Sequence, residues 1–188
     1  MTLLTEDQLG EVIDDNYREP GDQLFRKEGL AWYDVPSQNA DREAWLDNRF
    51  DPAQVQAWAE ILEADKRRGL VSQRLRIVSA QITDDEAMSL EGALPLIAGP
   101  QEVRILRRGE HPIPDIVDHD YFVIRRAAGV VIVIAMHYSS GGAFLGAEVV
   151  AADQHSPYLR EMELAWAIAQ PYADWWAAHP ELHRRAAA

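Results

Sequence analysis

The chain has 188 residues, of which 47% are hydrophobic and 26% are charged, as is typical of a folded domain that buries a core. It contains no cysteine, which excludes disulfides, zinc sites with thiolate ligands and a cysteine nucleophile, and which fits a reducing compartment. The formal net charge of −13 repels phosphate groups, so we expect no direct binding to nucleic acid or to an anionic membrane.

The N-terminal sequence lacks the basic and apolar regions of a signal peptide. The longest apolar run, residues 129–136, is too short to span a bilayer. We therefore predict a cytoplasmic protein with a single domain over residues 1–188. In this prediction an N-terminal helix (1–21) precedes an α/β core (22–179) and a short tail (180–188).

Helix signals occur at three places in the first part of the chain. Residues 5–8 form a capping-box pattern before apolar residues at helical spacing, and Pro20-Gly21 is expected to end this helix. Asp41 is expected to cap a short helix. Asp51-Pro52 is a strong start signal for a longer helix, which Gly69 is expected to end.

Strand and helix signals then alternate along the middle of the chain. Residues 24–35 are consistent with a strand or an extended segment, and residues 74–78 alternate like a strand. A helix is predicted over 84–94 and a second short strand over 103–106. Residues 111–120 contain two prolines and three aspartates, which indicates a loop.

Three strands and a long helix are predicted in the last part of the chain. The strands are residues 121–126, 130–137 and 144–150. Short links that contain glycine join them, which is typical of hairpins. A helix starting at Ser156-Pro157 is expected to continue until Pro180. We therefore predict an α/β or α+β fold, with a single mixed sheet, a C-terminal antiparallel meander and helices packed on the sheet.

A histidine and carboxylate set is the first candidate site. His119 and Asp120 lie in the predicted loop, and His137 at the end of a neighbouring strand can approach His119 across the hairpin. Two imidazoles and a carboxylate are ligands of iron, zinc and manganese, and they can also act as catalytic acids and bases. The alternative is a polar loop whose aspartates accept backbone hydrogen bonds. We predict no cofactor.

A basic patch is the second candidate site. It includes Arg68, Arg74 and Arg76, which stand close together in an acidic sequence. Such a patch can receive a phosphate or carboxylate, although cations near a helix C-terminus need no ligand to explain them. We include Tyr138 among the candidate ligand-binding residues.

Two other features have structural explanations. Ser139 and Ser140 follow His137 but lie where a turn is expected, outside any nucleophile-elbow sequence. Trp175 and Trp176 point about 100° apart on an ideal helix, so we expect one of them near the surface, where it would favour an interface.

An ordered set of segments carries a resemblance over roughly residues 22–176. The segments are residues 24–28, 33–36, 67–69, 74–79, 102–108, 118–122, 136–138 and 144–148. Their order and spacing resemble an actinobacterial family known as domain of unknown function 6879. The family's frequent neighbourhood to genes for helix-turn-helix regulators implies a regulatory or accessory protein. The resemblance implies no activity.

A more distant likeness is to the phospholipase D-like half-domain, in which a histidine–x–lysine motif enters a strand. His119-Asp120-Tyr121 is similar in position, but Tyr121 stands where the lysine would be. The likeness therefore implies a site that has lost its charge stabilisation and only binds.

These observations lead to two hypotheses for function. The first is a non-enzymatic regulatory or accessory protein, which binds a protein partner, such as a basic helix-turn-helix regulator, or a small ligand. The second is an enzyme of specialised metabolism that uses His119, Asp120 and His137, with or without a metal. A homodimer that pairs through the edge of the meander is compatible with both hypotheses.

Overall fold

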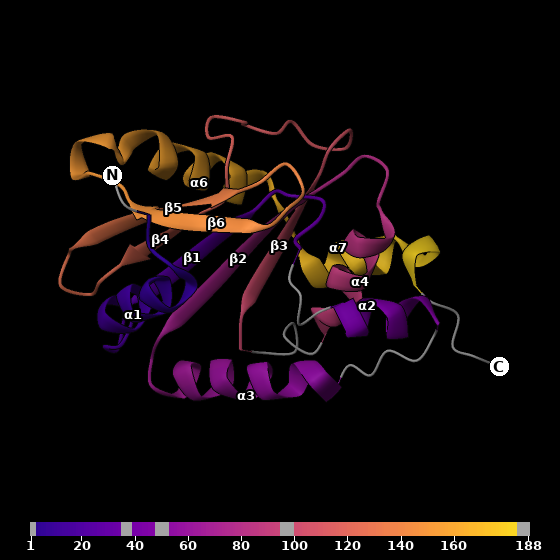
Figure 1. Ribbon diagram of the computed structural model, residues 1–188, viewed down its shortest axis with the longest axis horizontal. Helices are drawn as coiled ribbons and strands as arrows, with labels where there is room; N and C mark the ends of the chain where they lie inside the picture. The colour runs from indigo at the N-terminus through magenta and orange to yellow at the C-terminus, as the bar shows by residue number, and fades with distance from the viewer. Residues whose placement is uncertain (1–2, 35–38, 48–52, 95–99, 184–188) are drawn as a thin grey trace.

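One mixed sheet organises the protein. The computed structural model describes residues 3–34, 39–47, 53–94 and 100–183. Within them, seven strands form a sheet in the order β6-β5-β4-β1-β2-β3-β7 (Figure 1). The strands are β1 (Gln23–Glu28), β2 (Val71–Val78), β3 (Glu102–Arg107), β4 (Tyr121–Arg125), β5 (Val131–Tyr138), β6 (Phe144–Val149) and β7 (Gln170–Pro171). Strands β1, β2 and β3 are parallel, and the other pairings are antiparallel, which confirms the predicted mixed sheet and meander.

Helices cover both faces of the sheet (Figure 1). They are α1 (Glu6–Asn16), α2 (Asn39–Leu46), α3 (Ala53–Arg67), α4 (Asp84–Gly92), α6 (Ser156–Ile168) and α7 (Tyr172–Ala178), with short 3₁₀ helices at Ala152–Gln154 and Pro180–Leu182. Helix α6 packs on one face, where Met162 and Ala165 contact the central strands. On the opposite face, α1 covers strands β4 to β6, and α4 packs beside β2 and β3.

Local signals explain where several helices begin and end. Thr5 and Thr83 both form capping boxes, with Gln8 and Glu86 respectively, so that side chains satisfy the first backbone N–H groups of α1 and α4. Gly69 ends α3 with a φ of +85°, a conformation that favours glycine. The predicted start of α3 at residues 51–52 lies outside the described residues.

The prediction of a single long helix at the end of the chain is wrong. Helix α6 ends at Ile168, residues Gln170–Pro171 form the short strand β7 beside β3, and α7 follows. Pro171 explains the break, because it has no N–H to donate and disfavours helical backbone at the residue before it. This break places α7 beside α4 on the other face of the sheet.

The outer edge of β6 is partly covered. Leu4 donates its N–H to the Ala147 oxygen at 2.7 Å and accepts the Ala147 N–H at 3.0 Å. The homodimer that pairs through this edge stays a prediction, and it would have to form around this bridge. None of the described helices is long and apolar enough to cross a membrane.

Candidate functional site

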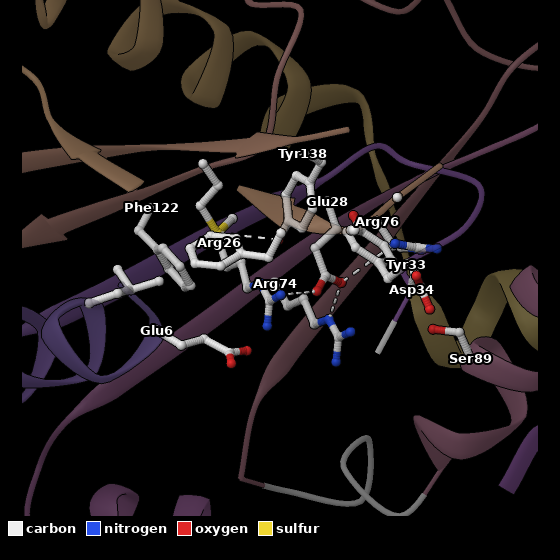
Figure 2. A pocket seen from close by; sticks show the side chains of 15 residues that line it. Glu6, Arg26, Glu28, Tyr33, Asp34, Arg74, Arg76, Ser89, Phe122 and Tyr138 are labelled. Atoms are coloured by element: carbon white, nitrogen blue, oxygen red, sulfur yellow. Dashed lines mark hydrogen bonds and ion pairs between the residues drawn. The ribbon is translucent and has the colours of Figure 1, made fainter. Parts of the chain in front are cut away.

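Charged side chains of β1 and β2 gather on the sheet face opposite α6. Because successive residues of a strand point to opposite faces, Arg26 and Glu28 share one face of β1. The parallel register places Arg26 beside Arg74 and Glu28 beside Arg76 on β2. These four residues line a pocket of about 650 Å³, which we call the arginine pocket (Figure 2).

The pocket lies over the middle of the sheet, between the two helices that cover this face. Leu9 of α1 lines it on one side, and Ser89 of α4 lines it on the other. Figure 2 shows Arg26, Glu28 and Arg74 together in its middle.

The turn after β5 closes another side of the pocket. Gly142 has a φ of +82°, and a Cβ atom added there would lie 2.7 Å from the Trp32 backbone oxygen. Asp34 donates its N–H to the Gly142 oxygen at 3.1 Å. Glycine therefore lets the turn approach the segment after β1, where Tyr33 lines the pocket.

Glu28 is the carboxylate at the centre of the arginines. Its side chain is 3% exposed, and its two oxygens lie 2.8 Å from Arg26 Nη2 and 2.6 Å from Arg74 Nε. Arg76 Nη1 is farther away, at 3.9 Å. Burial alone would raise the pKa of the Glu28 carboxyl, but the three arginines lower it to about 2. Glu28 is therefore ionised and holds the guanidinium groups together.

The arginines nevertheless have more donors than this carboxylate can satisfy. The Arg76 side chain is 5% exposed, and among the described residues its Nε and Nη1 atoms have no hydrogen-bond partner. The buried Nε atom of Arg26 also has no hydrogen-bond partner among these residues. Unsatisfied buried donors lower stability by about 1–3 kcal/mol each, and charged groups cost more. An anion in the pocket would supply the missing acceptors.

Tyr33 and Asp120 continue the network beyond the arginines. The Arg76 guanidinium lies over the Tyr33 ring, 5.1 Å from its centroid. Burial raises the pKa of the Tyr33 hydroxyl, which therefore stays protonated and donates a hydrogen bond to Asp120. Asp120 also accepts the Gly29 N–H at 2.7 Å. Burial raises the pKa of the Asp120 carboxyl, although these hydrogen bonds oppose the rise.

Three of the four predicted ligand-binding residues lie in this pocket: Arg74, Arg76 and Tyr138. Arg68 does not. Its side chain is 55% exposed and contacts Asp65 at 3.2 Å and the Arg18 oxygen at 2.9 Å. The basic patch divides because Arg68 lies before β2 begins, whereas Arg74 and Arg76 lie farther along the strand.

The predicted set of His119, Asp120 and His137 does not assemble. The two imidazole rings are close, with centroids 5.7 Å apart, and His119 Nε2 lies 3.0 Å from the hydroxyl of Tyr158 on α6. Asp120 points to the opposite face of the sheet, toward Tyr33, because adjacent residues of an extended strand alternate. Within the described ranges, no group of three or more histidines and carboxylates is placed to hold a metal ion.

The two tryptophans predicted at an interface occupy different environments. Trp175 is fully buried with Tyr172 against β3, so the prediction of an interface role for it is wrong. These two residues point inward together because they are three apart on α7. Trp176 is partly buried, and its ring stacks on that of His183 with centroids 4.5 Å apart.

Comparison with known proteins identifies the family but no closer relative. The family model described as "Domain of unknown function (DUF6879)" matches residues 11–177. The chain belongs to this family. No curated protein and no solved structure matches the chain.

Among the residues of the pocket that the sequence analysis did not identify are three at its polar centre: Arg26, Glu28 and Tyr33. A signal was present for two of them. Arg26, Lys27 and Glu28 are three consecutive charged residues of a predicted strand, so Arg26 and Glu28 must share one face. On β2, Arg74 and Arg76 alternate with apolar residues and also share a face. Charges on one face of each of two buried strands indicate a polar face between them.

Proposed function

We propose that this protein binds a small anionic ligand in the arginine pocket, as a ligand-binding accessory protein. One observation carries the proposal: the Arg76 guanidinium is buried in the pocket with two nitrogens that lack acceptors among the described residues. Planar guanidinium groups recognise carboxylate and phosphate oxygens through paired hydrogen bonds. An anion at these guanidinium groups would therefore supply acceptors that the buried donors lack.

The balance of charge supports the same proposal. Three guanidinium groups surround the single carboxylate of Glu28, in a chain with a formal net charge of −13. Glu6 and Asp34 also line the pocket, so the lining as a whole carries three arginines and three carboxylates. The charge is unmatched only at the buried centre, where Arg76 is 5% exposed and two of its nitrogens lack acceptors among the described residues. A buried cation of this kind is unfavourable unless a partner compensates for it, which favours a ligand.

The enzyme hypothesis has less support from the geometry. His119 and Asp120 line a second pocket, of about 290 Å³, but the Asp120 oxygens accept the Tyr33 hydroxyl and the Gly29 N–H, and His137 is not among the residues that line it. The three predicted residues therefore do not converge on one substrate site. The likeness to a phospholipase D-like half-domain, which rests on His119, stays a prediction.

A regulatory role is the broader part of the proposal. We propose that ligand binding in the cytoplasm controls contact with a basic helix-turn-helix regulator, since the acidic surface would attract such a partner. Co-purification with the regulator at low salt, with and without the ligand, tests this role. Absence of a complex in both conditions would contradict it.

The anion site itself is tested by thermal unfolding with sodium phosphate, sulfate and acetate, against sodium chloride at equal ionic strength. A ligand that binds the folded protein raises its unfolding temperature. We expect a saturable rise for at least one anion, lost in Arg74→Gln and retained in Arg68→Gln. Arg68 is the matched control because it lies outside the pocket. Equal responses of the two variants would overturn the proposal.

A further inference from the structure

We infer that the ligand of the arginine pocket is an organic anion with one negative charge and an apolar body of aromatic size. This inference rests on the proposed anion site and specifies the class of molecule that fits it. It follows from two properties of the pocket beyond the arginines, which are its apolar wall and the carboxylates around its cationic centre.

An apolar wall adjoins the arginines on the side of α1. Leu9, Phe122 and Met136 line the pocket and belong to the buried cluster beneath α1, and Phe144 of β6 packs against that cluster. Figure 2 shows Phe122 at one end of the pocket, beside Arg26, whose guanidinium lies 5.3 Å from the centroid of the Phe122 ring. An inorganic anion would contact the arginines and leave this wall hydrated.

Two aromatic side chains extend the wall across the charged centre. The rings of Tyr33 and Tyr138 meet edge to face, with centroids 5.3 Å apart, and both line the pocket. Tyr138 also packs against Phe144, at a centroid distance of 5.6 Å. Aromatic walls bind flat apolar groups with favourable stacking and edge contacts. The body of the ligand would therefore lie along these rings, with its charged group at the arginines.

The charges near the pocket favour one negative charge on the ligand. The buried Glu28 carboxylate offsets part of the charge of the three arginines, and the buried carboxyl groups of Asp120 and Glu86 also interact electrostatically with Arg76. Two exposed carboxylates, Glu6 and Asp34, also line the pocket, and they would repel a ligand with several negative charges. The pocket volume of about 650 Å³ lies in the range that accommodates small organic molecules.

The test compares three probes on the full chain: 1-naphthoate, acetate and naphthalene-1-carboxamide. Naphthoate has both the charge and the aromatic body, acetate has only the charge, and the amide has only the body. The concentration dependence of the unfolding temperature, at equal ionic strength, gives an apparent affinity for each probe. We expect naphthoate to bind at least about tenfold more tightly than either of the other probes, because only naphthoate can contact both the arginines and the apolar wall.

Two variants locate the apolar contact. Phe144→Ala should weaken naphthoate binding by roughly tenfold and leave acetate binding unchanged, because it removes part of the wall and none of the arginines. Leu145→Ala is the matched control, since Leu145 is the next residue of β6 and is 60% exposed. Acetate binding reports whether the Phe144 variant still folds with an intact anion site.

The outcomes separate this inference from the proposed function. Equal affinities for naphthoate and acetate, both lost in Arg74→Gln, would overturn the inference and leave the anion site standing. Equal affinities for naphthoate and the amide would also overturn it, because the charge would then add nothing. A response to neither anion in the unmodified chain would overturn both proposals.

Discussion

Two adjacent positions on β1 place charges on opposite faces of the sheet, and the two faces treat them differently. Lys27 points toward α6, where its Nζ lies 2.9 Å from Glu161 Oε2 and 2.6 Å from the Val117 oxygen. The other oxygen of Glu161 accepts the N–H groups of Ile116 and Val117, at 2.9 and 3.1 Å. Both side chains are 5% exposed or less, and one cation faces one anion.

On the face of Arg26 and Glu28, the cations and anions are not matched one to one. Three arginines surround one carboxylate, and donors of Arg26 and Arg76 lack acceptors among the described residues. The Lys27–Glu161 pair is complete and joins the loop before β4 to α6, so it has a structural role. Burial of charge therefore does not by itself indicate a site. An excess of unsatisfied donors beside a pocket does.

The largest effect should follow from breaking the complete pair. Lys27→Met leaves the Glu161 carboxylate buried without its cation, and we expect the free energy of unfolding to fall by about 3–5 kcal/mol. Urea denaturation measures this change. Arg125→Met is the control, because Arg125 pairs with Glu163 at the surface and should change stability by less than about 1 kcal/mol. Similar values for the two variants would contradict the structural role of Lys27.

The Glu28 carboxylate should make stability depend on pH in acid. Its pKa falls from an ordinary 4.5 to about 2 on folding, so its contribution is complete above pH 4.5 and is lost as pH falls toward 2. The advantage of the unmodified chain over Glu28→Gln should therefore shrink by about 3 kcal/mol between pH 5 and pH 2. Urea denaturation across this range is the measurement.

Asp120 should show the opposite dependence of stability on pH, because its pKa shifts in the opposite direction on folding. Burial raises its pKa in the folded state, so ionisation of Asp120 reduces stability as pH rises through its folded pKa. Asp120→Asn should gain stability relative to the unmodified chain over that rise. The same pH trend in both variants would contradict the assigned environments.

The turn that closes the arginine pocket should tolerate substitution of its glycine less well than an open turn does. Gly142→Ala should lower the free energy of unfolding by about 2–4 kcal/mol, since the added Cβ meets the Trp32 backbone as well as an unfavourable φ. Gly129→Ala should cost only about 1–2 kcal/mol, because Gly129 has a similar φ of +85° with no atom within 4 Å of the added Cβ. Equal losses, measured by urea denaturation, would show that the close approach at Gly142 is unimportant.

The smallest effect on stability should come from substitution of an arginine in the arginine pocket. Arg76→Met removes a buried cation with unsatisfied donors, so we expect the free energy of unfolding to stay unchanged or rise by about 1 kcal/mol. The same variant should lose the response to anions. A loss of stability as large as that of Lys27→Met would show that Arg76 has a structural role.

The sequence predicted the fold better than the site. The capping box at Thr5, the glycine at Gly69 and the strand patterns are local signals, and they indicate elements without knowledge of their neighbours. The break before α7 was also visible in Pro171, but the apolar spacing across it concealed the signal. The mixed sheet followed from the order of these elements.

The site depends on register, which the sequence does not contain. Arg74 and Arg76 were identified from their proximity in the chain, but Arg26 and Glu28 join them only because β1 and β2 are parallel neighbours. Likewise, the rings of His119 and His137 lie close together, whereas Asp120 is separated from them by strand alternation. Contacts between distant strands decide both cases.

The most direct measurement is an NMR titration that observes the arginine Nε–H groups of the ¹⁵N-labelled protein during addition of 1-naphthoate. Variants with each arginine substituted in turn assign the resonances of Arg26, Arg76 and Arg68. We expect saturable shifts for Arg26 and Arg76 with a common dissociation constant, and no saturable shift for Arg68. Unchanged Arg26 and Arg76 resonances, or a uniform drift of all three, would contradict the claim that the arginine pocket is an anion site.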